Sequence, residues 1–170
     1  MAHLQRPLLT GGRNMKTWAR YTLMLLGATL LFTTTTLAAE TISLEDYLLN
    51  YTYESRKDMK ATSRQVIDWV EDGKAVLVDI RFKEEQQTWG VNFGLKIPLS
   101  ELPKRLAELP KDQIIVAACP HKDRAIIAMV YLRTQGYKAR YLTDGLIGLM
   151  ENLRGEDALY FQELLKTSEP

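Results

Sequence analysis

The chain has 170 residues, of which 46% are hydrophobic and 25% are charged, and its formal net charge is +1. This length allows one domain and a targeting segment. The balanced charge gives no sign of the clustered basic surface that nucleic-acid-binding proteins present, so we expect no nucleic-acid partner. The net positive charge lies in residues 1–39, which contain four basic residues and no acidic one.

Residues 1–39 have the order of a secretory signal peptide. The basic residues precede an apolar run at 21–32, and small residues close the segment at Ala39. We therefore expect cleavage there and export to the periplasm or another extracytoplasmic space. Residues 21–39 are also uncharged and come close to the roughly 20 residues that span a bilayer, so an uncleaved membrane anchor is the alternative.

The first half of the remaining chain alternates between helical and extended patterns. Residues 40–60 are predicted to form a helical extension. Within it we expect a helix over 40–56, capped by Ser43, and a short basic connector over 57–60. The next predicted elements are a helix over 61–72 capped by Ser63, a buried strand over 75–80, a helical turn over 81–89, a loop over 90–94, a strand over 95–99 and a helix over 100–109 capped by Ser100.

The second half continues the alternation. It predicts a strand over 113–118, a helix over 124–134, a strand over 138–142, a helix over 146–153 and a C-terminal helix and tail over 154–170. Strands that alternate with helices favour a mostly parallel sheet covered on both faces. In such sheets ligands gather at the carboxyl ends of the strands, where Asp79–Arg81 and Cys119–Arg124 are expected.

Cys119 is the single cysteine of the chain, so it cannot form an intramolecular disulfide. It lies between a predicted strand and a predicted helix, where backbone N–H groups and the positive helix end can point at one sulfur. Nearby His121, Lys122 and Arg124 add positive charge, and together these groups favour the thiolate that a sulfur nucleophile requires. Asp123 opposes this trend, and it can instead hold Arg124 or cap the helix.

His121 has two interpretations. It is the only histidine in residues 40–170, so no histidine cluster exists there to bind a metal, and we expect neither a metal ion nor an organic cofactor. Beside a titratable thiol it can serve as a local cation or proton donor, and otherwise it is an exposed loop residue. The sequence leaves both open.

The chain contains several short motifs in a fixed order: Asp79-x-Arg81 at the end of a strand, Gly90-x-x-x-Gly94 with Ile97-Pro98-Leu99, Cys119-x-x-x-x-Arg124-Ala125, Gly136-Tyr137, and Leu142-x-x-Gly145. In this order and with this spacing, they resemble the rhodanese-like domain family over about residues 63–149. The resemblance implies an α/β domain over 61–153, with an open, mostly parallel five-stranded sheet and helices on both faces.

In that family the loop cysteine accepts a sulfane sulfur, holds it as a persulfide and passes it to a thiol or cyanide. The resemblance therefore implies that Cys119 is the nucleophile and that Arg124 closes the loop or holds an anionic donor. The rest of the active-site loop and its supporting residues would be Pro120, His121, Lys122, Asp123, Asp79 and Arg81. The implied partners are small sulfur-containing anions or thiols and a protein sulfur acceptor.

Loop length and composition bear on three alternatives. Four residues separate Cys119 from Arg124, which suits a sulfur atom, whereas related phosphatases have five. A thioredoxin-type site would need a second cysteine at position 122, which is lysine. Many family members have a glycine in the loop, but this chain has Pro120 and none. The alternative function is therefore a catalytically weak sulfur carrier or protein-binding module.

Overall fold

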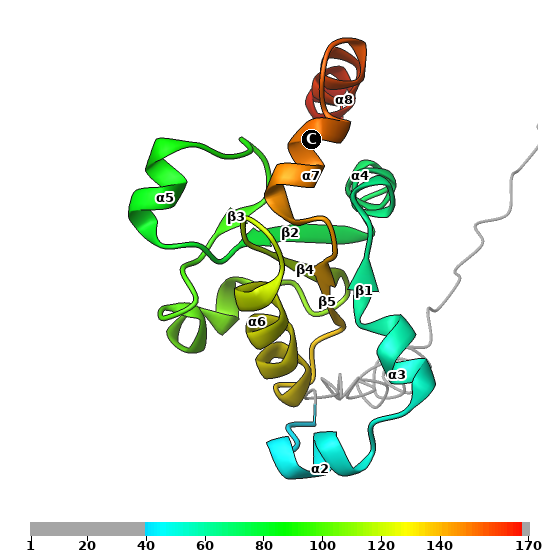
Figure 1. Cartoon of the computed structure of the whole chain (residues 1–170), viewed down its shortest axis with the longest axis vertical. Helices are drawn as coiled ribbons and strands as arrows, with labels where there is room; N and C mark the ends of the chain where they lie inside the picture. Colours follow the sequence, from blue (N-terminus) through cyan, green and yellow to red (C-terminus); the bar gives the residue numbers. More distant parts are fainter. Residues whose placement is uncertain (1–39, 168–170) are drawn as a thin grey trace, which may run out of the picture. The chain divides into compact units, whose positions relative to one another are not determined.

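The computed structural model describes residues 40–167 (Figure 1). The predicted signal peptide or membrane anchor over 1–39 lies outside the described residues. Within 40–167, none of the helices combines the length and the apolar character needed to cross a bilayer.

Five strands form one sheet in which every neighbouring pair is parallel. The strands are β1 (Lys60–Ala61), β2 (Ala75–Asp79), β3 (Leu95–Lys96), β4 (Ile114–Ala118) and β5 (Ala139–Leu142), in the order β1-β5-β4-β2-β3. β4 is therefore central, and it pairs with β2 along its whole length, with Asp79 opposite Ala118. The prediction of an open, mostly parallel α/β sheet is confirmed, and the sheet is parallel throughout.

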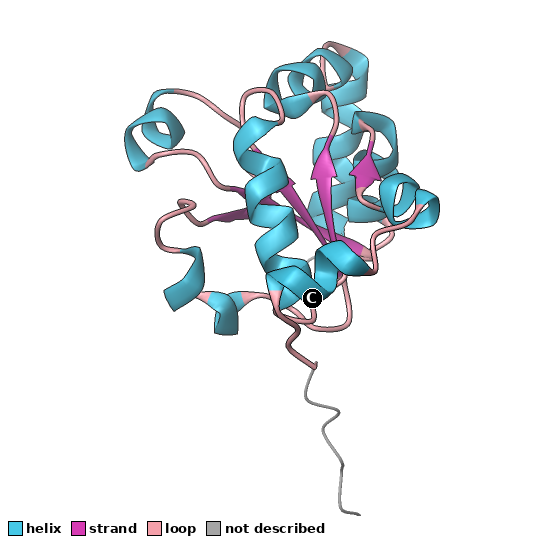
Figure 2. Ribbon diagram, turned by 60° about the horizontal axis from the view of Figure 1, so that its bottom comes forward, coloured by secondary structure: helices cyan, strands magenta, loops and turns pink. Residues whose placement is uncertain are grey.

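Buried side chains alternate between the two faces of the sheet, as expected for strands that are covered on both sides. Ile115 and Ala117 of β4 pack on one face with Met129 and Leu132 of α6 (Asp123–Thr134). Val116 of the same strand packs on the other face with parts of three helices. These helices are α4 (Ser63–Glu71), α7 (Gly145–Asn152) and α8 (Glu156–Thr167). Figure 2 shows helices on both sides of the strands.

The N-terminal extension differs from its prediction. The helix expected over 40–56 is two short helices, α2 (Leu44–Leu49) and α3 (Tyr53–Asp58). Ser43 caps α2 as predicted, but Asn50 ends it, and Thr52 starts a new helix by accepting a hydrogen bond from the Ser55 amide. The basic connector is also partly extended, because Lys60–Ala61 form β1 beside β5.

Two further helix predictions need correction. Thr62, not Ser63, caps α4: its side chain accepts from the Gln65 amide, and the Gln65 side chain accepts from the Thr62 amide. The helix expected over 100–109 is two 3₁₀ turns, Leu102–Lys104 and Leu106–Glu108. Prolines at 103 and 110 explain the difference, because proline lacks an N–H and disfavours helical geometry in the residue before it.

Candidate active site

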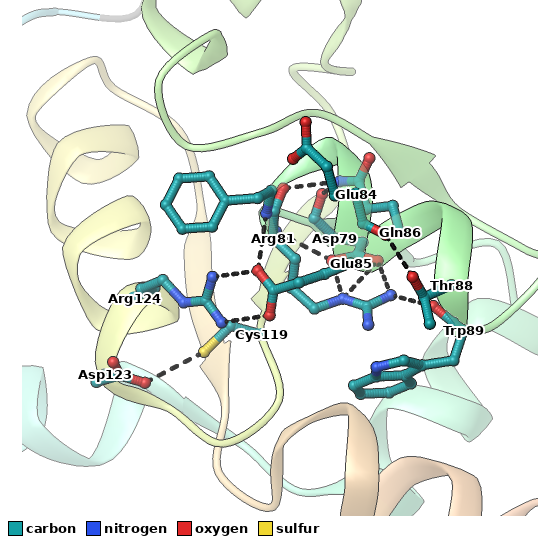
Figure 3. A network of polar contacts seen from close by, with 11 residues as sticks. Asp79, Arg81, Glu84, Glu85, Gln86, Thr88, Trp89, Cys119, Asp123 and Arg124 are labelled. Atoms are coloured by element: carbon teal, nitrogen blue, oxygen red, sulfur yellow. Dashed lines mark hydrogen bonds and ion pairs between the residues drawn. The ribbon is translucent and has the colours of Figure 1, made fainter.

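Cys119 directly follows β4, and α6 begins four residues later, so the cysteine loop sits at the carboxyl edge of the central strand. Asp79 ends the neighbouring strand β2, and Arg81 follows it. The two segments Asp79–Arg81 and Cys119–Arg124 therefore meet at this edge of the sheet, as expected. α5 (Lys83–Thr88) lies beside them, and Figure 3 shows side chains from α5, the cysteine loop and the start of α6 pointing toward one another.

The sulfur of Cys119 is surrounded by backbone amides and has no exposed surface, since the residue is 0% exposed. The N–H groups of His121, Arg124 and Ala125 form hydrogen bonds with it. Its thiol also donates to Oδ1 of Asp123, with Sγ and Oδ1 3.6 Å apart. The expected convergence of amides on one sulfur is therefore present.

The expectation of a resting thiolate is wrong. Burial raises the pKa of Cys119, because it removes the charged form from water, and this effect outweighs the amide hydrogen bonds that lower the pKa. The carboxylate of Asp123 raises it further. The amides are in place to stabilise a negative sulfur, but the resting side chain is a thiol.

Arg124 is held by a residue that the sequence analysis did not single out. Both oxygens of Glu85 on α5 accept hydrogen bonds from its guanidinium, at 2.6 and 2.9 Å (Figure 3). The guanidinium also lies 5.4 Å from the centre of the Phe82 ring. Hydrogen bonds from Arg124 lower the pKa of Glu85 to about 2, so the pair is ionised at neutral pH. This ion pair joins the start of α6 to α5, which fits the loop-closing role considered for Arg124, and that role stays a prediction.

Asp79 and Arg81 form a buried ion pair behind the loop. Arg81 donates to both carboxylate oxygens of Asp79, with Nη2 2.7 Å from Oδ2, and to the backbone oxygen of Trp89. The guanidinium lies 3.9 Å from the centre of the Trp89 ring. A Cβ at Gly90 would lie 2.5 Å from Nη2, so this close contact requires glycine. This arrangement fits the supporting role expected for the pair.

A second element, α7, also contacts the cysteine loop directly. At the start of α7, the Leu146 amide donates to the carbonyl of Cys119 at 2.8 Å. Gly145 has a φ of +66°, and a Cβ there would overlap the carbonyl oxygens of Pro120 and His121. Gly145 therefore allows α7 to approach the loop directly.

The other loop residues lie as follows. His121 and Lys122 are exposed, and neither takes part in an ion pair within residues 40–167. Pro120 is half-buried, and its carbonyl accepts from the Ile147 amide at 3.4 Å. Asp123 is exposed and does not hold Arg124. It accepts hydrogen bonds from the Arg124 amide and from Cys119, which lower its pKa.

Sequence reasoning missed Glu85 as a site residue, and it missed the contact of Gly145 with the cysteine loop. Glu85 lies in the predicted helical turn over 81–89, but no spacing rule connects it with Arg124, 39 positions away. Gly145 was identified as part of the family resemblance, between a predicted strand and a predicted helix. Its contact with the cysteine loop depends on how β4 and β5 pair, which the turn itself does not reveal.

With this geometry established, the chain can be compared with known proteins. Residues 62–151 match the family model described as the rhodanese-like domain. This match covers more than half of the chain, and the protein belongs to the rhodanese-like domain family. The resemblance seen in the sequence is thereby confirmed.

Two curated relatives match in sequence. A sulfurtransferase of Allochromatium vinosum is 34% identical over 98 residues, which cover 58% of this chain and 79% of the relative. The HTH-type transcriptional regulator Rv0324 of Mycobacterium tuberculosis is 38% identical over 79 residues, which cover 45% of this chain. Those residues span only 35% of the regulator.

Solved structures agree in fold. The human single-domain sulfurtransferase TSTD1 is 24% identical with a TM-score of 0.50, and the match covers 55% of this chain and 96% of that protein. The thiosulfate sulfurtransferase of Pseudomonas aeruginosa is 24% identical with a TM-score of 0.51. That match covers 60% of this chain and 20% of the enzyme, so the likeness concerns one domain.

Proposed function

We propose that this protein is a sulfurtransferase that carries a sulfane sulfur as a persulfide on Cys119 and passes it to a thiol or cyanide. The observation that carries the proposal is the convergence of three backbone N–H groups on Sγ at the start of α6. Such a cradle stabilises a negative sulfur without a metal or an organic cofactor. The Allochromatium vinosum sulfurtransferase supports the same class of activity.

In the proposed reaction Cys119 first loses its proton, and Sγ attacks the outer sulfur of the donor. The donor's own bond to that sulfur breaks, and the leaving group keeps the electron pair. An acceptor thiolate or cyanide then attacks the outer sulfur of the persulfide, and the Cys119 thiolate leaves. The amides stabilise the thiolate in both steps, which offsets the burial that disfavours it at rest.

Intact mass spectrometry tests the proposal. The full chain is incubated with a sulfane-sulfur donor, freed of excess donor and measured before and after addition of a thiol acceptor. We expect a gain of one sulfur on the wild type, none on Cys119→Ser, and loss of that sulfur to the acceptor. A wild-type chain that never gains sulfur, or a Cys119→Ser variant with undiminished transfer, contradicts the proposal.

A sulfur carrier or protein-binding module is the second candidate, and the burial of Cys119 favours it. A sulfur atom with no exposed surface and a raised pKa reacts only when the loop opens and the proton leaves. In the same experiment, a persulfide that forms but is not released to thiols or cyanide identifies the carrier.

We also propose that the protein acts outside the cytoplasm, either released after cleavage near Ala39 or anchored by residues 21–39. The support is the order of basic, apolar and small residues in 1–39. The mass of the protein recovered from cells distinguishes the two forms, because cleavage removes the whole segment. Recovery of the uncleaved chain from the cytoplasm contradicts both.

A further inference from the structure

Positive charge around the cysteine loop is largely neutralised by the protein itself. Arg124 is held by both oxygens of Glu85, and the fully buried Arg81 is held by both oxygens of Asp79. Within the described residues, Lys122 is the loop's one cation without an ion pair. The negative charge of Asp123, the next residue in the chain, offsets the positive charge of Lys122.

Asp123 is also the charged group in direct contact with the reacting atom. Its Oδ1 lies 3.6 Å from Sγ of Cys119 (Figure 3). The carboxylate is ionised at neutral pH, because a hydrogen bond from the Arg124 amide holds its pKa below the usual value. A donor whose outer sulfur reaches Sγ therefore arrives beside a negative charge. The amide cradle can balance charge on the transferred sulfur, and Lys122, the one unpaired cation of the loop among the described residues, stands directly before the Asp123 carboxylate in the chain.

We propose that Asp123 makes this site select organic persulfides, R–S–SH, over thiosulfate as sulfur donors. This inference rests on the proposed sulfurtransferase function. Thiosulfate is a dianion, and its leaving group, sulfite, carries two negative charges away from a position next to the carboxylate. An organic persulfide carries at most one charge on its two sulfur atoms, and in glutathione persulfide the other charged groups lie farther along the organic part of the donor. Repulsion at short distance from this exposed carboxylate therefore penalises thiosulfate more.

An exposed aromatic ring beside the loop favours the organic donor as well. Phe82 is 60% exposed and lies next to the Arg124 guanidinium, with 5.4 Å between the guanidinium carbon and the ring centre. It offers apolar surface to the organic group of a persulfide, whereas thiosulfate has no apolar group to bury.

The loading step is balanced without an oxidant: Cys119–SH and R–S–SH give Cys119–S–SH and R–SH. A bond forms between Sγ and the outer sulfur, and the donor's S–S bond breaks. The departing R–S⁻ keeps the electron pair and receives the proton that Cys119 loses.

The test compares two donors on three full-length chains: the wild type, Asp123→Asn and the control Asp112→Asn. Asn at 123 keeps an oxygen that can accept from the Arg124 amide but removes the charge. Asp112 is an exposed carboxylate at the opposite end of β4 from Cys119. Sulfur loading of Cys119 is followed in single turnovers by intact mass, with thiosulfate and with glutathione persulfide.

We expect the wild type to load from glutathione persulfide at least tenfold faster than from thiosulfate. Asp123→Asn should raise the second-order rate constant for thiosulfate by about tenfold, as expected when one charge is removed beside a dianion near the protein surface. The constant for glutathione persulfide should change much less, and Asp112→Asn should change neither.

The outcomes separate this inference from the function on which it rests. A wild-type chain that loads equally fast from both donors, or faster from thiosulfate, overturns the selectivity and leaves the sulfurtransferase function intact. An Asp123→Asn variant that folds but does not gain rate with thiosulfate also overturns it. A wild-type chain that loads from neither donor overturns both proposals. The wild-type comparison needs no variant and decides the point even where Asp123→Asn fails to fold.

Discussion

At the scale of single residues, two opposing influences act on the pKa of the Cys119 thiol. Burial and the neighbouring Asp123 carboxylate favour the thiol, while three backbone amides favour the thiolate. Because burial has the larger effect, the folded chain binds the Cys119 proton more tightly than the unfolded chain does. The tighter binding of this proton adds to the free energy of unfolding. The added stability is fully present below the ordinary cysteine pKa and is lost as pH rises through the raised pKa of Cys119 in the folded chain.

The rate of alkylation by iodoacetamide as a function of pH measures this shift. We expect the rate for the native protein to keep rising beyond the pKa of an ordinary cysteine, about 8.5, because only the thiolate reacts. The same chain in denaturant is the control, and its profile should level off near the ordinary value. A native profile that levels off at lower pH than the denatured one would show that the amides outweigh burial.

Among the helices and strands, the turn before α7 determines how closely the sheet edge packs around the cysteine. Gly145 and Gly73 have the same φ of +66°, but they differ in their surroundings. A Cβ at Gly73 meets no atom within 4 Å, whereas one at Gly145 overlaps the cysteine loop. Substitution at Gly73 therefore measures the cost of backbone strain alone, whereas substitution at Gly145 adds the cost of steric overlap.

We expect Gly73→Ala to cost about 1–2 kcal/mol of stability, the usual penalty for a side chain in left-handed geometry. Gly145→Ala should cost a further 1–3 kcal/mol or so from overpacking and should also slow sulfur loading on Cys119. Urea unfolding and the mass-based loading assay measure the two effects. Equal losses of stability in the two variants, with loading unchanged, would show that the loop does not depend on Gly145.

The elements that the sequence predicted well are those with a strong local pattern. The β-branched runs before Asp79 and Cys119 are buried strands, and the lone cysteine lies at the strand end where it was expected. The prediction failed over 100–109, where local prolines override helical spacing. The pairing of Arg124 with Glu85 and the burial of the sulfur depend on tertiary packing, so no local pattern could reveal them.

For the whole molecule, the described residues outside the family match, 40–61 and 152–167, are held by specific contacts. Asp58 of α3 receives ion pairs from Arg133 and Arg140, which join the N-terminal extension to α6 and β5. At the other end of the chain, Phe161 of α8 is 2% exposed and packs edge-on against Phe93, with ring centres 4.9 Å apart. Both extensions are therefore part of the folded unit.

Substitution of Phe161 tests whether α8 is part of the folded unit. We expect Phe161→Ala to lower the free energy of unfolding by about 3–5 kcal/mol, because it leaves a cavity between α8 and the 90–94 loop. Tyr160 is 61% exposed on the same helix, and Tyr160→Ala should change stability by no more than about 0.5 kcal/mol. Thermal or urea unfolding of both variants gives the comparison. Similar small effects in both would mean that α8 contributes little to the fold.

The burial of Cys119 also bears on how the protein survives oxidation. Peroxide and small disulfides both react with an accessible thiolate, and the resting side chain is neither accessible nor ionised. The chain has no second cysteine that could rescue an oxidised sulfur by forming a disulfide. Burial therefore slows the oxidation of the one atom on which the proposed chemistry depends, and it also slows the covalent joining of two copies of the protein through that atom.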